Sequence, residues 1–418
     1  MKKIILIAFV LSALCASAQD IPLVYNVENT AAGNADPVFP TIGQLPYCEQ
    51  LTDPFLSSDG KSRALDFKDW AKRRGEIARE IQHYEIGEKP AVSMDQIVAT
   101  LEDSVLTVKT IVRGDTLTQT AVIHYPTGGT APYPLMIGAD HISLPRHLLT
   151  ERHIATMTFS ARQINGYSQF GDSKTRDFER LYPHLANNGA YSEWAWGFSR
   201  LIDGLQKLGT EVTRIDMSHI GVTGCSYAGK MALFCGAFDE RVALTITQEP
   251  GGGGAAAWRV TRAHNARCAK EDTWEGIDNT DYHWFMQRLK STFGGDSVYY
   301  LPYDHHELVA MCCPRAVLML GNPDFRWLAD GSGYVSMHAA HKVWQQYGIA
   351  DRCGYSIVGG HGHCSLPESQ YEEVCAFLDK FLLGKTDVNT HYTKVPNFTD
   401  TTKTGATPVV DPDHWSRW

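Results

Sequence analysis

Short apolar runs alternate with longer helical stretches over much of the chain, and this alternation constrains the fold most. The apolar runs predict strands at Leu135–Ala139, Ile154–Phe159, Ile220–Thr223, Val242–Thr247, Ala316–Leu320 and Tyr355–Val358. Amphipathic stretches predict helices at Ser192–Leu208, Met337–Tyr347 and Glu368–Leu383. Strands that alternate with helices form a mostly parallel sheet covered by helices on both faces. The expected class is therefore α/β, a three-layer sandwich.

Upstream of this region the pattern is different. The apolar spacing predicts a helix over Leu65–Tyr84. Alternating residues then predict antiparallel strands near Ile97–Leu101, Val105–Val112 and Gln119–Tyr125. We expect residues 19–60 to be an extended lead-in, residues 61–385 to form one catalytic domain, and residues 386–418 to be a tail on the surface.

The first eighteen residues read as a signal peptide. Lys2 and Lys3 precede an apolar run over Ile4–Leu14, and Ala16-Ser17-Ala18 is typical of a cleavage site. The run is shorter than the roughly 20 residues that a membrane span needs. Cys15 raises the alternative of a lipoprotein, but Leu14 stands where a small residue is expected before a lipidated cysteine. The sequence thus predicts a secreted or periplasmic protein without a membrane anchor.

Charge and cysteine content exclude several classes of protein. The 418 residues carry 47 acidic against 38 basic side chains, a net charge of −9, and phosphate binding requires the opposite balance. We expect no nucleic acid partner. Loss of Cys15 leaves an odd number of cysteines, so at least one is free. The chain has no C-x-x-C pair, which argues against zinc-ribbon and thioredoxin sites.

The segment Ile220-Gly-Val-Thr-Gly-Cys-Ser-Tyr-Ala-Gly-Lys230 carries the sharpest chemical signal. An apolar strand ends at Gly224, Ser226 stands between small residues, and a helix is expected from about Gly229. This pattern is typical of a nucleophile elbow, with Ala228 in place of the usual second glycine. The alternative is an ordinary strand-to-helix loop with an idle serine.

A nucleophilic serine needs a histidine base and an acid that orients it. The segment Gly359–Pro367 follows the last predicted strand of the sandwich and holds His361 and His363. Metal binding is the alternative for both, but no nearby residues complete a tetrahedral site. Asp304-His305-His306-Glu307 also looks metal-like, although loop packing or helix capping explains it better.

Two acids compete for the third role. Glu249 ends one predicted strand and Asp324 follows another, so both lie at the sheet edge that carries Ser226. Acids at strand ends are also common as solvated or capping groups. The run Pro250–Gly254 beside Glu249 can approach a substrate closely because glycine has no side chain, but it lacks the residues of a phosphate loop.

Together these motifs resemble the glucuronoyl esterases of carbohydrate esterase family 15. The resemblance rests on Gly224-Cys-Ser-Tyr-Ala-Gly-Lys230, Gln248-Glu-Pro-Gly-Gly-Gly-Gly with Trp258-Arg259, Pro302-Tyr-Asp-His-His306, and His361-Gly-His-Cys364. It covers roughly residues 60–385. It implies an α/β-hydrolase fold and a secreted serine esterase that cleaves esters of 4-O-methyl-glucuronic acid on plant cell-wall xylan. Such an enzyme needs no cofactor and no metal.

The resemblance also implies roles for individual residues. Ser226 is then the nucleophile, His363 the base and Glu249 the acid, while Asp324 matches the position that some bacterial members use. The backbone near Tyr227 binds the oxyanion. The implied contacts to the uronic acid are Lys230, Trp327 and Glu275.

Tyr227 departs from the family pattern, which usually has arginine directly after the serine. A phenol can donate one hydrogen bond but carries no positive charge to pair with a carboxylate. Esterases that demethylate pectin or deacetylate xylan are therefore alternatives, as is an inactive, glycan-binding homologue.

Cys225 and Cys364 are expected to form a disulfide. They neighbour the implied nucleophile and base, which must approach to hydrogen-bonding distance. The family carries a bridge at the matching positions, and an exported protein meets oxidising conditions. Two free thiols beside the site are the alternative.

Overall fold

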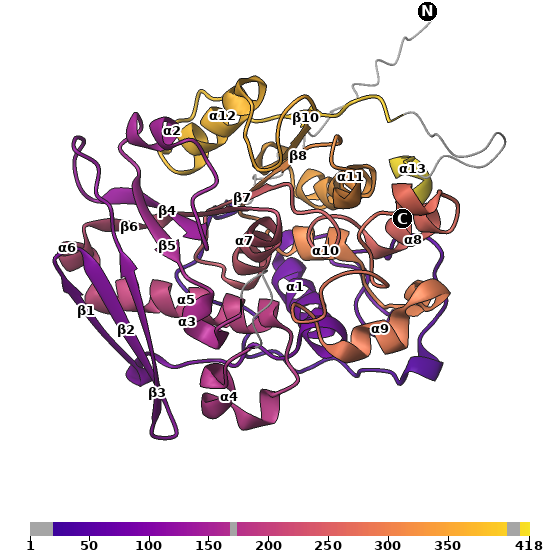
Figure 1. Ribbon diagram of the computed structural model, residues 1–418, viewed down its shortest axis with the longest axis horizontal. Helices are drawn as coiled ribbons and strands as arrows, with labels where there is room; N and C mark the ends of the chain where they lie inside the picture. The colour runs from indigo at the N-terminus through magenta and orange to yellow at the C-terminus, as the bar shows by residue number, and fades with distance from the viewer. Residues whose placement is uncertain (1–19, 168–173, 399–409) are drawn as a thin grey trace, which may run out of the picture.

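The computed structural model describes residues 20–167, 174–398 and 410–418, so the predicted signal peptide lies outside it. Within these residues the main sheet has the order β10-β9-β8-β7-β6-β4-β5, and all its neighbouring strands pair in parallel (Figure 1). The strands are β4 (Tyr133–Ala139), β5 (Ala155–Phe159), β6 (Ile215–Cys225), β7 (Leu244–Gln248), β8 (Ala316–Gly321), β9 (Cys353–Ile357) and β10 (Thr393–Lys394). The predicted α/β class and parallel sheet are confirmed.

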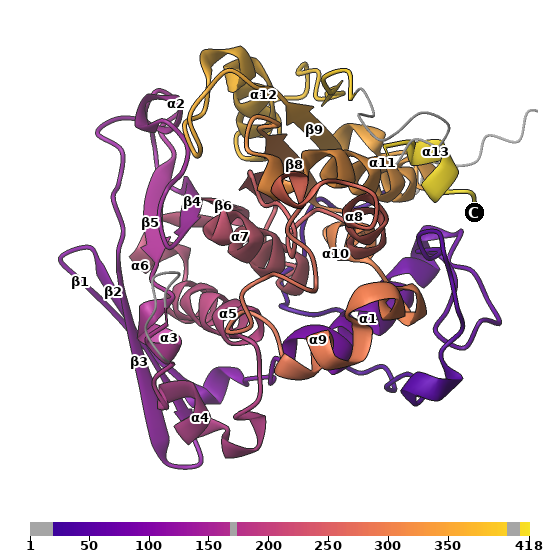
Figure 2. The same cartoon turned by 45° about the vertical axis from the view of Figure 1, so that its right-hand side comes forward.

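Helices cover both faces of this sheet (Figure 2). One face carries α2 (Arg146–Thr150) and α12 (Tyr371–Phe381), and the other carries α5 (Ala190–Leu208), α7 (Tyr227–Phe238), α10 (His305–Ala310) and α11 (Asp330–Gln346). Successive side chains of β7 point to opposite faces of the sheet, so that each face packs against its own layer of helices. Leu244 and Ile246 pack in one cluster with α2 and α12, whereas Thr247 donates its hydroxyl to the carbonyl of Gly229 in α7, at 2.8 Å.

Strands β1 (Ile97–Glu102), β2 (Val105–Val112) and β3 (Asp115–Val122) form a separate antiparallel sheet beside α5 (Figure 2). All three strands were expected. The third begins and ends earlier than predicted, because Arg113 and Gly114 both adopt positive φ and reverse the chain at once. Gln119 of β3 donates its side-chain amide to the carbonyl of Gly197 in α5, at 3.0 Å.

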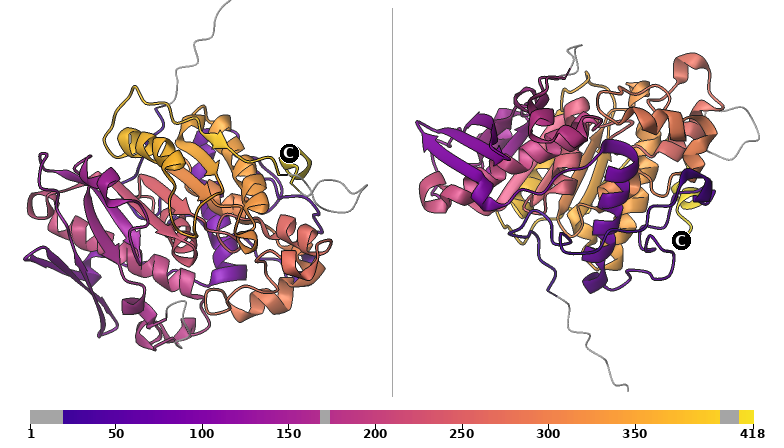
Figure 3. Two further views of the ribbon diagram at one scale, coloured as in Figure 1. Left: turned by 45° about the horizontal axis from the view of Figure 1, so that its top comes forward. Right: turned by 90° about the horizontal axis from the view of Figure 1, so that it is seen from below.

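Between Asp20 and Asp66 the backbone forms only one short 3₁₀ helix, Ile42–Gln44. Helix α1 (Phe67–Ile81) begins after Asp66, whose carboxylate accepts the N–H of Lys68, and continues as the π-helical turn Gln82–Ile86. Figure 3 shows α1 lying across the molecule when seen from below. The shorter helices are α3 (Arg162–Asn165), α4 (Asp177–Leu181), α6 (Thr210–Thr213), α8 (Trp258–Asn265) and α9 (Gln287–Phe293).

The C-terminal segment is more than a surface tail. Strand β10 extends the main sheet, and α13 (Pro412–Trp415) buries Trp415 in a cluster with Leu51, Ala257 and Val335. The two-residue strand β10 and the single buried side chain of Trp415 are too short to produce a periodic pattern of apolar residues in the sequence. Across the described ranges, no helix has both the length and the apolar character that a bilayer crossing demands.

Candidate active site

Ser226 occupies a strained turn between β6 and α7. Its φ is +62° and its ψ is −128°, a conformation that residues with a side chain rarely adopt. The turn closes because its neighbours are small: a Cβ at Gly224 would clash with the carbonyl of Ala228, and one at Gly229 with the carbonyl of Gln248. This strand–turn–helix geometry is that of a nucleophile elbow.

Helix α7 begins at Tyr227, two residues earlier than predicted. As the first residue of the helix, Tyr227 has an N–H that no carbonyl of α7 can accept. The positive end of the helix dipole lies at the same place. The turn therefore offers a donor and a favourable field to an anion that forms beside Ser226.

His363 and Glu249 meet at the edge of the sheet. The Nδ1 of His363 lies 2.5 Å from Oε2 of Glu249, and the other oxygen, Oε1, accepts the backbone N–H of Cys364 at 3.1 Å. Glu249 follows β7 with φ +47°, and its side chain is only 1% exposed. A buried carboxylate held at two points fixes both the orientation and the tautomer of the imidazole.

Asp324 and His361 are engaged elsewhere. The exposed carboxylate of Asp324 accepts the N–H of Gly360 at 2.6 Å, in the loop that leads to His363. The Nε2 of His361 lies 2.8 Å from the carbonyl oxygen of Val358. Both side chains thus shape the loop that carries His363, and of the two candidate acids it is Glu249 that bonds to the imidazole.

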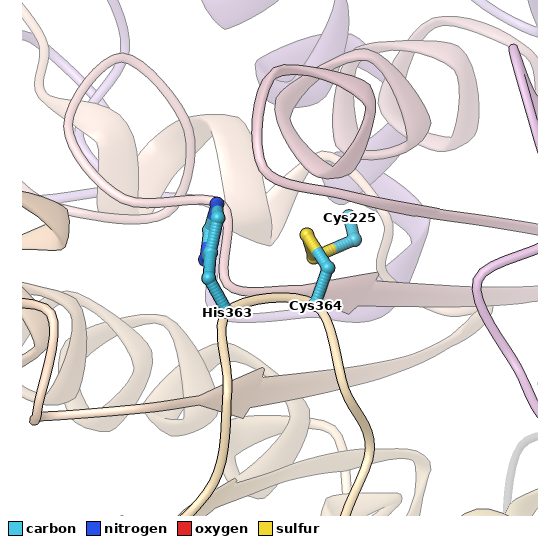
Figure 4. Close-up of side chains that lie close together, drawn as sticks. All are labelled: Cys225, His363 and Cys364. Atoms are coloured by element: carbon cyan, nitrogen blue, oxygen red, sulfur yellow. A yellow bond between two sulfur atoms is a disulfide. The ribbon is translucent and has the colours of Figure 1, made fainter.

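Cys225 and Cys364 form the predicted disulfide, with Cα atoms 5.7 Å apart. Figure 4 shows His363 beside this bridge, on the same loop as Cys364. Since Ser226 directly follows Cys225, the bridge fastens the loop of His363 to the nucleophile turn. The two sulfurs and a nitrogen of His363 lie within 4.8 Å of one another, but sulfurs bonded to each other are not the thiolates that bind metal.

The other metal-like cluster has a structural role. Asp304 caps helix α10 by accepting the N–H of His305 at 2.8 Å. The same carboxylate forms a buried ion pair with Arg259, in which Nη1 lies 3.1 Å from Oδ2. The helix cap expected from the sequence is present at Asp304.

Three of the residues implied to contact substrate lie together. The Nζ of Lys230, in the first turn of α7, lies 2.8 Å from Oε2 of Glu275. The backbone N–H of Glu275 donates to the carbonyl of Trp327 at 2.9 Å. The ring of Trp327 is 49% exposed and its centroid lies 5.8 Å from that of His363. A buried ammonium and an exposed indole thus stand at one site.

Sequence reasoning missed several neighbours of these residues. The ammonium of Lys230 lies 5.4 Å from the ring centroid of Trp284, and the hydroxyl of Tyr227 donates to the carboxylate of Asp140. Asp330 lies near Glu249, and its burial, together with that negative charge, raises its pKa to about 7. Only Asp140 carried a usable signal, since it follows a predicted strand at the same edge of the sheet.

Comparisons with known proteins agree with this geometry. A family model described as glucuronyl esterase, fungi, matches residues 108–348. A 4-O-methyl-glucuronoyl methylesterase from Hypocrea jecorina (strain QM6a) is 37% identical over 336 residues, which are 80% of this chain and 70% of that protein.

Solved structures extend the likeness to the fold. The glucuronoyl esterase catalytic domain from Hypocrea jecorina has a TM-score of 0.80 and 33% identity, and the match covers 91% of this chain and 98% of that one. A serine-to-alanine variant of the Sporotrichum thermophile glucuronoyl esterase, in complex with methyl 4-O-methyl-β-D-glucopyranuronate, has a TM-score of 0.79 and 30% identity, covering 92% and 98%. By sequence, fold and the arrangement of its site, this chain belongs to the glucuronoyl esterase family.

Proposed function

We propose that this chain is a serine esterase that hydrolyses esters of 4-O-methyl-glucuronic acid in plant cell-wall polysaccharides. The observation that carries the proposal is the bond between His363 and Glu249 on a loop that a disulfide fastens beside Ser226. An esterase of this kind needs a base of fixed orientation next to a serine on an elbow. The names of the related proteins supply the substrate class.

In the proposed reaction, Oγ of Ser226 attacks the ester carbonyl carbon while Nε2 of His363 takes the hydroxyl proton. Glu249 holds Nδ1 and stabilises the imidazolium that forms. The tetrahedral intermediate then expels the alcohol, which receives the proton from His363. His363 next takes a proton from a water molecule whose oxygen attacks the acyl carbon. The bond between this carbon and Oγ of Ser226 then breaks, Oγ regains the proton from His363, and the uronic acid leaves.

The charge that develops on the carbonyl oxygen is proposed to be stabilised by the start of α7. The backbone N–H of Tyr227 has no acceptor within its own helix, and the helix dipole adds to its effect. This stabilisation appears only when the oxygen becomes negative, so it lowers the barrier rather than strengthening substrate binding.

Lys230, Glu275 and Trp327 are proposed to bind the sugar. The exposed indole of Trp327 offers an apolar face to a pyranose ring, while the Lys230–Glu275 pair offers donors and acceptors to its hydroxyls. Lys230 also supplies the positive charge that Tyr227 lacks. The reason to prefer uronic esters over acetyl esters is that the Lys230–Glu275 pair and Trp327 have a pyranose ring and its hydroxyls to bind, which an acetyl group lacks.

Tyr227 is the reason to keep other substrates as candidates. A phenol carries no positive charge, so no cation directly follows Ser226, and the hydroxyl of Tyr227 already bonds to Asp140. Methyl-esterified pectin and acetylated xylan are therefore second candidates, and a homologue that binds glycans without hydrolysis remains a third.

We further propose that residues 1–18 are a signal peptide removed on export, and that residues 61–385 form the catalytic domain between the lead-in 19–60 and the segment 386–418.

The test is a side-by-side assay of the purified protein on benzyl glucuronate, methyl-esterified pectin and acetylated xylan. We expect the highest kcat/KM on benzyl glucuronate. Lys230→Met should lower this value at least tenfold and leave any activity on an acetyl ester within about threefold. Faster hydrolysis of pectin or acetylxylan would replace the proposed substrate, and no hydrolysis of any ester would favour the binding homologue.

A further inference from the structure

The hydroxyl of Tyr227 and the carboxylate of Asp140 form a hydrogen bond across 87 residues of sequence. Neither group takes part in the proton transfers proposed for Ser226, His363 and Glu249. Burial and the neighbouring carboxylate raise the pKa of Tyr227 well above its ordinary value, so the phenol keeps its proton and remains a donor.

The main chain places Asp140 level with the nucleophile turn. Asp140 follows β4, which pairs with β6 so that Gly138 stands opposite Thr223. Two residues beyond this pair, the two segments reach Asp140, just past the end of β4, and Cys225, directly before Ser226. Its φ of +63° is a strained value for a residue with a side chain, and its N–H donates to the carbonyl of Phe159 at 2.8 Å.

The chain beyond Asp140 folds back over the strand it has just left. A Cβ at Gly138 would clash with the backbone of His141 and Ile142, so only glycine allows this reversal. Further along the loop, the hydroxyls of Ser143 and Thr223 lie 2.9 Å apart. Since Thr223 belongs to β6, the loop is fastened to the nucleophile strand on one side and to Tyr227 on the other.

Tyr227 is itself held firmly. Its ring lies nearly parallel to that of Trp284, at 6.3 Å between centroids, and packs edge-on to Trp194 at 6.4 Å. Its carbonyl accepts the hydroxyl of Tyr191 at 3.1 Å. These contacts fix both the ring and the backbone of Tyr227. A hydroxyl held in this way can fix the position of the Asp140 carboxylate to which it donates.

From these contacts we infer that Asp140 and the Tyr227 side chain form a brace that joins the two halves of the oxyanion site. In α/β-hydrolases one oxyanion donor is the N–H after the nucleophile, and the second comes from the loop after the neighbouring strand. Here the first half is Tyr227 and the second is the loop that begins at Asp140. Asp140 and the Tyr227 hydroxyl are positioning residues, and this role rests on the proposed esterase function.

The test compares kcat, KM and melting temperature for Tyr227→Phe, Asp140→Ala and the double variant. Each single variant should lower kcat about 10- to 100-fold, less than the loss of an oxyanion donor itself. KM should stay within about twofold, because the oxyanion exists only in the transition state. The double variant should be no slower than the worse single variant, since both remove the same brace. Asp140→Asn keeps an acceptor and should retain at least a third of kcat.

Tyr125→Phe is the matched control. The partly buried hydroxyl of Tyr125 also donates a hydrogen bond, to the carbonyl of Thr213 at 2.7 Å. Thr213 lies just before β6, at the end of that strand away from Ser226. Removing this bond should therefore leave kcat unchanged. Three results would overturn the inference. In the first, the effects of Tyr227→Phe and Asp140→Ala on kcat multiply in the double variant. In the second, kcat of either single variant stays within twofold of wild type, and in the third only KM or the melting temperature changes.

A fluorophosphonate probe separates this inference from the proposed function. The probe forms an oxygen–phosphorus bond with the nucleophile and loses fluoride, and its phosphoryl oxygen occupies the oxyanion site. The labelling rate of Tyr227→Phe should fall by the same factor as kcat. If wild-type Ser226 is not labelled, the proposed function fails; if it is labelled and Tyr227→Phe reacts equally fast, only the brace fails.

Discussion

The Nδ1 of His363 and Oε2 of Glu249 lie 2.5 Å apart although 114 residues separate them in the chain. Glu249 directly follows β7, the strand next to the one that leads to Ser226, and receives a second bond from Cys364. Glu249, His363 and the disulfide therefore meet at one corner of the sheet. Each of these contacts can be broken by a single substitution.

Ser226→Ala should abolish ester hydrolysis and leave the melting temperature unchanged. Losing the nucleophile of a comparable triad costs on the order of a million-fold in turnover. The control is Ser218→Ala, an exposed serine on the same strand, which should keep full activity. An Ser226→Ala protein with more than a few per cent of wild-type kcat would exclude Ser226 as the nucleophile.

Glu249→Ala should reduce kcat far more than Asp324→Ala. A base left in the wrong tautomer costs roughly 10⁴-fold in a serine protease, and Glu249 is the carboxylate bonded to His363. Asp324 bonds only the backbone of Gly360 in the same loop, so its loss should cost less than about tenfold. The reverse ranking in steady-state kinetics would move the acid to Asp324.

Removal of the disulfide by the pair Cys225→Ser and Cys364→Ser should destabilise the protein by about 2–5 kcal/mol. It should also lower kcat, because the loop of His363 loses its covalent anchor. Chemical denaturation measures the first effect, and Cys268→Ser, at a free cysteine, is the control. Recovery of an alkylated, unlinked Cys225 peptide from a non-reduced digest would show that the bridge is absent.

Asp330→Asn should reduce the pH dependence of stability. With its folded-state pKa raised from 3.8 to about 7, Asp330 keeps a proton between about pH 4 and 7 that the unfolded chain has lost. Stability therefore falls as pH rises through this window. The substitution should shrink the advantage of pH 5 over pH 8 by at most about 3 kcal/mol.

Urea unfolding at the two pH values measures this difference, and Asp103→Asn, an exposed carboxyl in a turn, is the control. Glu307, whose burial raises its pKa to about 8, leaves a residual dependence of the same sign. An Asp330→Asn protein with the pH dependence of wild type would show that Asp330 is ionised in the folded state at pH 5.

The sequence predicted the parallel sheet because its strands are buried on both faces and so read as continuous apolar runs. Ser226 and its small neighbours were visible because the elbow is a local structure, set by residues adjacent in the chain. The start of α7 was predicted two residues late because nothing in Tyr227 or Ala228 marks the first residue of a helix.

Other features depend on the folded chain alone. The choice of Glu249 over Asp324 is set by which strand end faces His363, and both acids end strands at the same edge. The Tyr227–Asp140 bond joins residues that no local pattern connects. The buried Asp330 was unseen because the first residue of α11 comes near Glu249, the residue after β7, only in the folded chain.

The disulfide closes a covalent ring of chain that spans 139 residues and contains Ser226, Glu249 and His363. A single proteolytic cut anywhere in this ring leaves both fragments joined through Cys225 and Cys364. A cut in the segment between β7 and β8, for example, does not separate Ser226 from His363. Within this ring, one broken peptide bond therefore leaves Ser226 and His363 in the same covalently connected molecule.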